Sequence, residues 1–434
     1  MKRLEYLWSA SLLIVIGLSS CQDKTTEKVT YTANVPVYAS EQSLRELVGS
    51  EGPKELSGAG KMHIRGNYIY IVKPFAGIHV IDNSNPSSPQ NVSFISLPGV
   101  LDIASYGFTL YADSYKDLVS LDISNPLSVK EVDRDEDVFQ SMLPPTLNNY
   151  PIATIDETQG VVVDWKVEQI TETREVDNWG RGWGAQEGLD FASTASEGSN
   201  VKGSDILLSA YQPVPGQSGS TARFTALNDQ LYTVNGDQIK VFSLAEEQNP
   251  SEGVTVETGR EVETIFPMEN MLFLGTTTGM LVYGLNNPAS PDFISGFNHA
   301  TGCDPVVVED SIAYVTLRTG TQCGGWANQL DVLDVRNITN PQSIASYQFT
   351  SPHGLGIDNN ILFICDGSDG LKIYDATDKW HITDHPLAHY ADIQAYDVIP
   401  LGDILLLIGE DGFYQYSYAE PQNITLLSFI STNN

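Results

Sequence analysis

Residues 77–86 read GIHVIDNSNP, residues 118–126 read LVSLDISNP and residues 330–341 read LDVLDVRNITNP. Each stretch is a short apolar run that ends in Asp and passes into Asn-Pro. Asn and Asp side chains bond their own backbone in turns, and Pro fixes φ where a loop offers no partner for an amide. The shared pattern therefore predicts a strand that ends in a tight turn.

Copies of this outline recur about every forty residues from residue 60 onward, which is a spacing typical of propellers and solenoids. Each copy has a further apolar run upstream, such as YIYIV at 68–72, and an alternating run after Asn-Pro, such as VSFISL at 92–97. Four antiparallel strands per unit describe a propeller blade, and blades that stack around an axis cover each other's apolar faces. We predict an all-β fold with a single propeller.

Counting the copies predicts eight blades. The unit at 140–176 is the weakest, because its strands at 150–155 and 160–165 lack an Asn-Pro turn; seven blades is the alternative if this unit is an insertion. The predicted units are 61–99, 100–139, 140–176, 217–259, 260–300, 301–350, 351–394 and 395–434.

The three quoted stretches resemble LVIVD repeats, a β-propeller module of secreted and surface proteins, and residues 60–126 are most similar to bacterial LVIVD-repeat lipoproteins. The resemblance covers most of residues 60–434 and implies the propeller fold, but it implies almost nothing about chemistry. The units at 140–176 and 395–434 depart from the repeat because they lack the Asp-x-x-Asn-Pro turn.

The N-terminus has the features of a secretion signal: Lys2 and Arg3, an apolar run at 12–18, and small residues before Cys21. The string LSSC at 18–21 resembles the lipobox of bacterial lipoproteins, which implies cleavage before Cys21 and lipid on its sulfur and new amine. An ordinary signal peptide with a chance Cys is the alternative. We predict a signal peptide at 1–20, a tether with a short helix at 21–58, the propeller at 59–434, and an exported, lipid-anchored protein of the outer membrane on either face.

Charge excludes some partners. The 434 residues include 55 acidic and 23 basic side chains, for a formal net charge of −32. Such a chain repels nucleic-acid phosphates and anionic lipid headgroups. We therefore expect no nucleic-acid partner and membrane contact only through the lipid anchor.

The start of the first strand of each blade should lie at the mouth of the central channel. The polar residues expected there are Asp102, Arg223, Glu263, Asp304, His353 and Asp397. Carboxylates crowded in a narrow mouth would raise each other's pKa or hold a cation, and either result would mark a pocket. The alternative is structural: these carboxylates join neighbouring blades by accepting hydrogen bonds from backbone amides.

An irregular segment at 177–216 contains Trp179, Trp183 and Phe191, and should lie over the same rim. Exposed aromatic side chains there could stack on a sugar or a peptide. Alternatively, the two Trp residues only hold this covering segment against the propeller. Trp326, in the loop at 318–326, belongs to the same candidate binding surface. Cys303 opens the first strand of the unit at 301–350 and Cys323 lies in the loop at 318–326, so both belong to this rim, and a disulfide between them is geometrically plausible.

The sequence predicts no cofactor and no metal site. Calcium at the Asp turns is the alternative, but no turn has the dense acidic spacing of a calcium-binding hand. The four-residue spacing of His381, His385 and His389 would suit a metal on a helix, but Pro386 breaks any helix there.

The first functional hypothesis is a binding or scaffold module that holds an envelope protein or glycan at the channel-mouth rim. A hydrolase or lyase that uses the acidic mouth with His353, with or without a divalent metal, is the second. A purely structural part of an envelope complex is the third.

Overall fold

A computed structural model describes residues 25–58, 60–146, 148–176, 215–299, 305–319 and 327–432. The chain divides into two compact units. The larger comprises residues 37–145, 156–164 and 207–434, and the smaller comprises residues 1–36, 146–155 and 165–206. Within the described residues, no helix is both long enough and apolar enough to cross a membrane.

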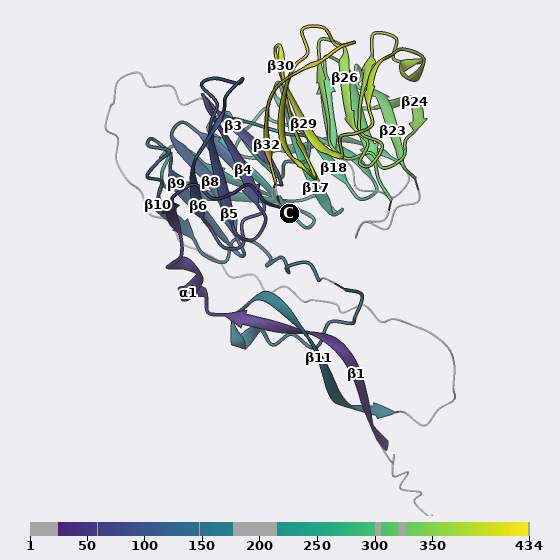
Figure 1. Cartoon of the computed structure of the whole chain (residues 1–434). Helices are drawn as coiled ribbons and strands as arrows, with labels where there is room; N and C mark the ends of the chain where they lie inside the picture. The colour runs from purple at the N-terminus through teal and green to yellow at the C-terminus, as the bar shows by residue number, and fades with distance from the viewer. Residues whose placement is uncertain are drawn as a thin grey trace, which may run out of the picture. The chain divides into compact units, whose positions relative to one another are not determined.

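The larger unit is a β-propeller. Its described part forms seven antiparallel sheets, and each blade takes four consecutive strands of the chain (Figure 1). Blade 1 contains β3 (Met62–Arg65), β4 (Tyr68–Lys73), β5 (Gly77–Asp82) and β6 (Gln90–Ser96); blade 2 contains β7 (Ile103–Tyr106), β8 (Thr109–Ser114), β9 (Asp117–Asp122) and β10 (Lys130–Asp135). Blade 3 contains β13 (Phe224–Leu227), β14 (Gln230–Asn235), β15 (Gln238–Ser243) and β16 (Ser251–Glu257); blade 4 contains β17 (Val262–Met268), β18 (Met271–Thr276), β19 (Gly279–Gly284) and β20 (Asp292–Asn298); blade 5 contains β21 (Val306–Glu309), β22 (Ile312–Leu317), β23 (Gln329–Asp334) and β24 (Gln342–Gln348). Blade 6 contains β25 (Leu355–Asp358), β26 (Ile361–Cys365), β27 (Leu371–Asp375) and β28 (Pro386–Tyr390); blade 7 contains β29 (Ala395–Leu401), β30 (Ile404–Gly409), β31 (Gly412–Ser417) and β32 (Thr425–Ser431).

The all-β propeller prediction is confirmed, with seven blades in place of the favoured eight. The unit predicted at 140–176 is not a blade, because its strand β11 (Val161–Val176) runs without a turn and pairs with β1 (Thr25–Ala39). Part of the predicted tether is therefore strand. Its β-branched and aromatic residues favour that conformation, and the hydroxyls of Thr30 and Thr171 lie 2.8 Å apart.

The turns after the third strands form as their sequence predicts. In each of four blades the Asp side chain accepts a hydrogen bond from the amide two residues later, which fixes the turn locally. The pairs are Asp82 with Ser84 (2.9 Å), Asp122 with Ser124 (2.8 Å), Asp334 with Arg336 (3.0 Å) and Asp375 with Thr377 (2.9 Å).

Apolar packing holds neighbouring blades together. A cluster of buried apolar side chains lies between each successive pair of blades, including blades 7 and 1. Hydrogen bonds add to these interfaces: for example, the Tyr111 hydroxyl donates to the carbonyl of Glu247 (2.6 Å), and the Tyr232 hydroxyl donates to that of Pro288 (2.8 Å). In each case a second strand is tied to a turn of the next blade.

The junction between blades 7 and 1 closes the ring through side chains, since each blade uses its own four strands. Their packing includes Leu56, which precedes the first blade in sequence. The buried residues of this cluster are Leu56, Met62, Ile69, Ile71, Ile81, Ile399, Leu406, Ile408 and Phe413.

Residues 40–58, which we call the strap, join the N-terminal side of the chain to three blades. Helix α1 (Glu41–Arg45) lies against blade 2, and β2 (Gly49–Glu51) extends blade 1 by pairing with β6. Ser50 Oγ accepts a hydrogen bond from the amide of Val129 in blade 2 (2.7 Å), and Leu56 packs between blades 7 and 1. Two short 3-10 turns, η1 (Glu157–Gln159) and η2 (Ile382–Asp384), complete the described helical elements.

Replacing Leu406 with Ala should weaken the closure of the ring. Leu406 is fully buried between blades 7 and 1, and truncating a buried Leu costs about 2–5 kcal/mol. Urea unfolding should show a loss of that size for Leu406→Ala. The matched control is Leu426→Ala on the outer strand of blade 7, where the side chain is 54% exposed. Equal losses of unfolding free energy for the two variants would contradict the view that Leu406 helps to close the junction between blades 7 and 1.

Candidate functional site

The axis of the propeller is filled by the chain itself. Residues 215–222, which we call the axial segment, include β12 (Gln217–Ser218), which pairs with β3 at the inner edge of blade 1. Backbone hydrogen bonds join Gly216 to Ser105 of blade 2 (3.0 Å) and Ala222 to Ile265 of blade 4 (2.8 Å). Because the first strands of successive blades lie side by side around the axis, a segment bonded to several of them occupies the space between them.

Asp397 at the start of blade 7 binds the axial segment. Its carboxylate accepts hydrogen bonds from Ser220 Oγ (3.1 Å) and Thr221 Oγ1 (2.9 Å), and Ser220 Oγ in turn accepts from the amide of Leu355 in blade 6 (2.9 Å). Burial raises the pKa of Asp397 to about 6, against the opposing effect of these hydrogen bonds. Asp397 thus links blades 6 and 7 to the axial segment.

Close approach explains the glycines of the axial segment. A Cβ on Gly219 would lie 2.0 Å from Oδ2 of Asp397, and one on Gly216 would lie 2.2 Å from Nε2 of His63. The buried His63 ring bridges Ser218 Oγ and Ser105 Oγ, both at 2.7 Å. Burial lowers its pKa to about 3, so the ring is neutral and serves as a hydrogen-bonding bridge.

Asp102 joins blades 1, 2 and 3. Its carboxylate forms an ion pair with Lys61, which directly precedes blade 1, and accepts a hydrogen bond from the backbone amide of Arg223 in blade 3 (2.6 Å). Asp113 accepts from the amides of Leu101 and Asp102 (2.7 and 2.8 Å), and burial raises its pKa to about 6.

His353 and Arg318 form a second group at the same end of the strands. Arg318 Nη1 lies 3.1 Å from His353 Nε2, and the Tyr396 ring lies 5.3 Å from the imidazole. Burial and the charge of Arg318 lower the pKa of His353 to about 4. Burial also lowers the pKa of Arg318, while the nearby charge of Glu263 opposes this. The neutral His353 therefore accepts a hydrogen bond from the arginine.

The structure brings the predicted mouth residues that it describes to one end of the strands, but not around an open acidic cavity. Asp102 and Asp397 are 1% and 3% exposed and accept hydrogen bonds from other parts of the propeller. The Arg223 side chain turns to Met142 Sδ (3.0 Å) and the carbonyl of Val234 (3.0 Å). The remaining predicted residues lie outside the described part of the chain: Cys21, Trp179, Trp183, Phe191, Cys303, Asp304, Cys323 and Trp326.

Sequence reasoning missed the cationic and hydroxyl members of this network, namely Lys61, Ser220 and Thr221. Ser220 and Thr221 belong to no repeat, and they are 177 and 176 residues from Asp397. Lys61 offered a weak signal, as a basic residue at the entry to a first strand in an acidic chain. Among the described side chains, no group of three or more His, Cys, Asp and Glu is arranged to hold a metal.

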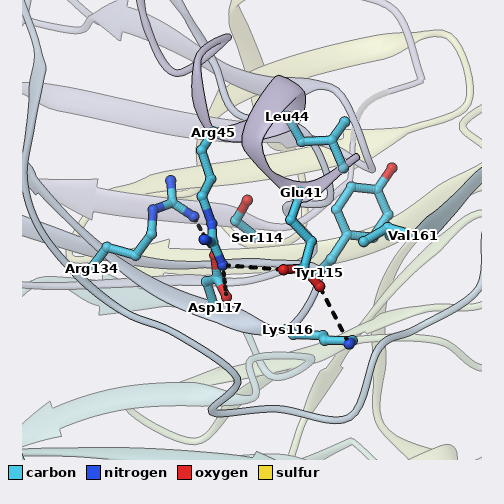
Figure 2. A pocket seen from close by; sticks show the side chains of 9 residues that line it. All are labelled: Glu41, Leu44, Arg45, Ser114, Tyr115, Lys116, Asp117, Arg134 and Val161. Atoms are coloured by element: carbon cyan, nitrogen blue, oxygen red, sulfur yellow. Dashed lines mark hydrogen bonds and ion pairs between the residues drawn. The ribbon is translucent and has the colours of Figure 1, made fainter. Parts of the chain in front are cut away.

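A separate charged cluster, away from the axial segment, lies where the strap meets blade 2 (Figure 2). Arg45 of helix α1 donates to both oxygens of Asp117 (2.9 and 3.3 Å), and Arg134 donates to the same carboxylate (2.8 Å). The hollow between them has a volume of about 10 Å³, which is about enough for one water molecule. This cluster attaches the helix to the blade and has no room for a larger ligand.

Family comparison identifies the repeat. The LVIVD repeat family matches residues 58–94 and 101–134, which include most of blades 1 and 2. This chain carries LVIVD repeats. No curated protein shows significant sequence similarity to this chain.

Solved structures with a similar fold have very different sequences. The periplasmic gluconolactonase PpgL of Pseudomonas aeruginosa is 9% identical with a TM-score of 0.50, over 89% of this chain and 96% of that one. Sqt1 of Saccharomyces cerevisiae is 9% identical (TM-score 0.49; 93% and 89% covered), and BamB of Moraxella catarrhalis is 8% identical (0.46; 88% and 92%). At 9% identity the likeness to PpgL shows the propeller fold alone.

The pKa of Asp397 makes the stability of the propeller depend on pH. Its folded value of about 6 exceeds the ordinary 3.8, so the folded state holds the proton more tightly than the unfolded state. The contribution of Asp397 is therefore greatest below about pH 4 and is lost as pH rises to about 6.

Asp397→Asn removes this titration. The stability of the wild type relative to Asp397→Asn should fall by about 1–3 kcal/mol between pH 4 and pH 7, measured by urea unfolding at both pH values. A difference between the two proteins that does not change with pH would show that Asp397 does not titrate in this range.

Proposed function

We propose that this chain is an exported, lipid-anchored binding or scaffold propeller of the bacterial cell envelope, held at the outer membrane through Cys21. The observation that carries the proposal is the filled axis. The axial segment and the carboxylates of Asp102 and Asp397 bind each other and the blades, so these residues maintain the ring and leave its outer surface to contact a partner.

The same observation disfavours the hydrolase or lyase hypothesis. A general acid or base must reach the proton that it transfers. Asp397 lies beneath Ser220 and Thr221, Asp102 is covered by Lys61 and the amide of Arg223, and both carboxylates are buried. The lone pair of His353 faces the guanidinium of Arg318.

The strap supports the anchoring role. Any pull transmitted through residue 40 would be shared among helix α1, strand β2 and Leu56, which contact blades 2, 1 and 7. Arg45 contributes a bidentate ion pair with the buried Asp117, which is the stronger form of such a contact. An anchored propeller needs an attachment of this kind between its lipidated N-terminal segment and the blades.

The proposed partner is an envelope protein or glycan. The net charge of −32 disfavours nucleic acid. The aromatic residues Trp179, Trp183, Phe191 and Trp326 remain proposed partner contacts. Cross-linking in intact cells followed by mass spectrometry tests this role: the wild type should recover the same envelope partner repeatedly, and deletion of residues 180–210 should reduce its recovery. Recovery of the propeller alone from wild-type membranes would contradict the binding role.

Lipidation at Cys21 is tested separately. Cys21→Ser should move the chain from the membrane pellet to the soluble fraction and remove the acyl mass from its N-terminal peptide, since no lipid can be attached to the hydroxyl by thioether chemistry. Cys365→Ser is the matched control, because Cys365 is buried in blade 6 and cannot accept lipid in the folded protein. Equal membrane recovery of Cys21→Ser and the wild type would contradict the anchor.

A further inference from the structure

The turn between β27 and β28 of blade 6 differs from the repeat. It covers residues 376–385, compared with 83–89 in blade 1, and it contains the 3-10 turn η2. Trp380 in this turn is 59% exposed. The turn follows a third strand, so it lies on the face of the propeller opposite the starts of the first strands, where Asp102 and Asp397 are found.

Contacts with neighbouring blades fix the backbone of this turn. Ile382 is fully buried in the cluster between blades 5 and 6. The Tyr347 hydroxyl accepts a hydrogen bond from the amide of Ile382 (3.1 Å) and lies 3.3 Å from the carbonyl of Lys379. Lys379 Nζ donates to Asn360 Oδ1 (2.7 Å). The residues on both sides of Trp380 are therefore held in place.

Polar residues lie next to Trp380 in the turn and bind one another and its backbone. Asp378 accepts hydrogen bonds from the Trp380 amide (3.1 Å) and from Nδ1 of His381 (2.9 Å). The side chains of Asp378 and His381 are 45% and 62% exposed. The imidazole thus has a fixed orientation, with one ring nitrogen bound to Asp378 and the other left for a further partner.

We propose that this turn is a carbohydrate-binding site, in which Trp380 stacks on the C–H face of a pyranose ring and His381 and Asp378 bind its hydroxyl groups. The inference rests on the binding role proposed above and names a ligand class on a face other than the channel mouth. A pyranose has an apolar face and a hydroxylated edge, and the turn offers an exposed aromatic face with hydrogen-bonding groups beside it.

The surroundings of Trp380 favour a sugar over an apolar protein surface. A Trp that anchors a protein interface lies in a well-packed, desolvated pocket. Here the side chains of Asp378 and His381 are 45% and 62% exposed, and an apolar partner would cover their remaining polar atoms without pairing them. The turn is already ordered before a ligand binds. Binding therefore does not incur the entropic cost of ordering the turn, which favours affinity.

The probe is a printed array of neutral, N-acetylated and sialylated oligosaccharides, followed by calorimetric titration of the best-bound sugar. Trp380→Ala should weaken binding at least tenfold, and Trp380→Phe should weaken it less because a ring remains. Phe293→Ala is the matched control: Phe293 is also 59% exposed but lies on the outer strand of blade 4, and its loss should leave binding unchanged.

Two results would overturn the proposal: no array sugar bound by the wild type, or equal loss of binding in Trp380→Ala and Phe293→Ala. Unchanged melting temperatures check that both variants fold, as expected for exposed rings. Loss of a cross-linked envelope protein in Trp380→Ala without any sugar binding would also overturn it, while supporting the binding role. Membrane release of Cys21→Ser is independent of these outcomes, so failure of the anchor and failure of the sugar site remain distinguishable.

Discussion

The structure depends on the apolar packing of one blade face against the next. Each four-stranded sheet has two apolar faces and can bury them only between neighbours. The constraint is most severe at the junction of blades 7 and 1, where the two ends of the ring meet without sharing a strand. Burying one aliphatic side chain contributes about 1.5–3 kcal/mol, so Leu406, Phe413 and their partners together can hold the ring closed.

Closing the ring creates a second requirement at the axis. The first strands face one another there, and their inner edges carry backbone groups that must be paired when buried. The axial segment supplies partners: β12 pairs with β3, Ala222 bonds Ile265, and Ser220 bonds Leu355 and Asp397. Small residues are needed because a Cβ on Gly216 or Gly219 would overlap polar atoms of the blades. The polar groups at the axis are therefore a consequence of closing the ring, because the buried backbone groups of the first strands need hydrogen-bond partners.

The repeat made the blades predictable because each turn is fixed by residues that are adjacent in sequence, as Asp82 and Ser84 are. The repeat also placed Asp102 and Asp397 near the axis, because each lies at the start of the first strand of its blade. It failed at 140–176, where β-branched residues favour a strand but no Asp-x-x-Asn-Pro turn folds it back. Ser220 and Thr221, the partners of Asp397, could not be predicted, since only the closed ring brings together residues 177 and 176 positions apart.

The two faces of the propeller use their side chains differently. At the starts of the first strands, charged groups such as Asp102 and Lys61 are paired within the protein and hold the blades in register around the axis. On the opposite face, the longer turn of blade 6 uses Ile382 and Tyr347 for anchoring and presents Trp380 to solvent. The anchoring contacts account for the order of the turn, but they do not require a large aromatic residue at its tip. The proposed sugar would bind the indole face that these contacts leave exposed.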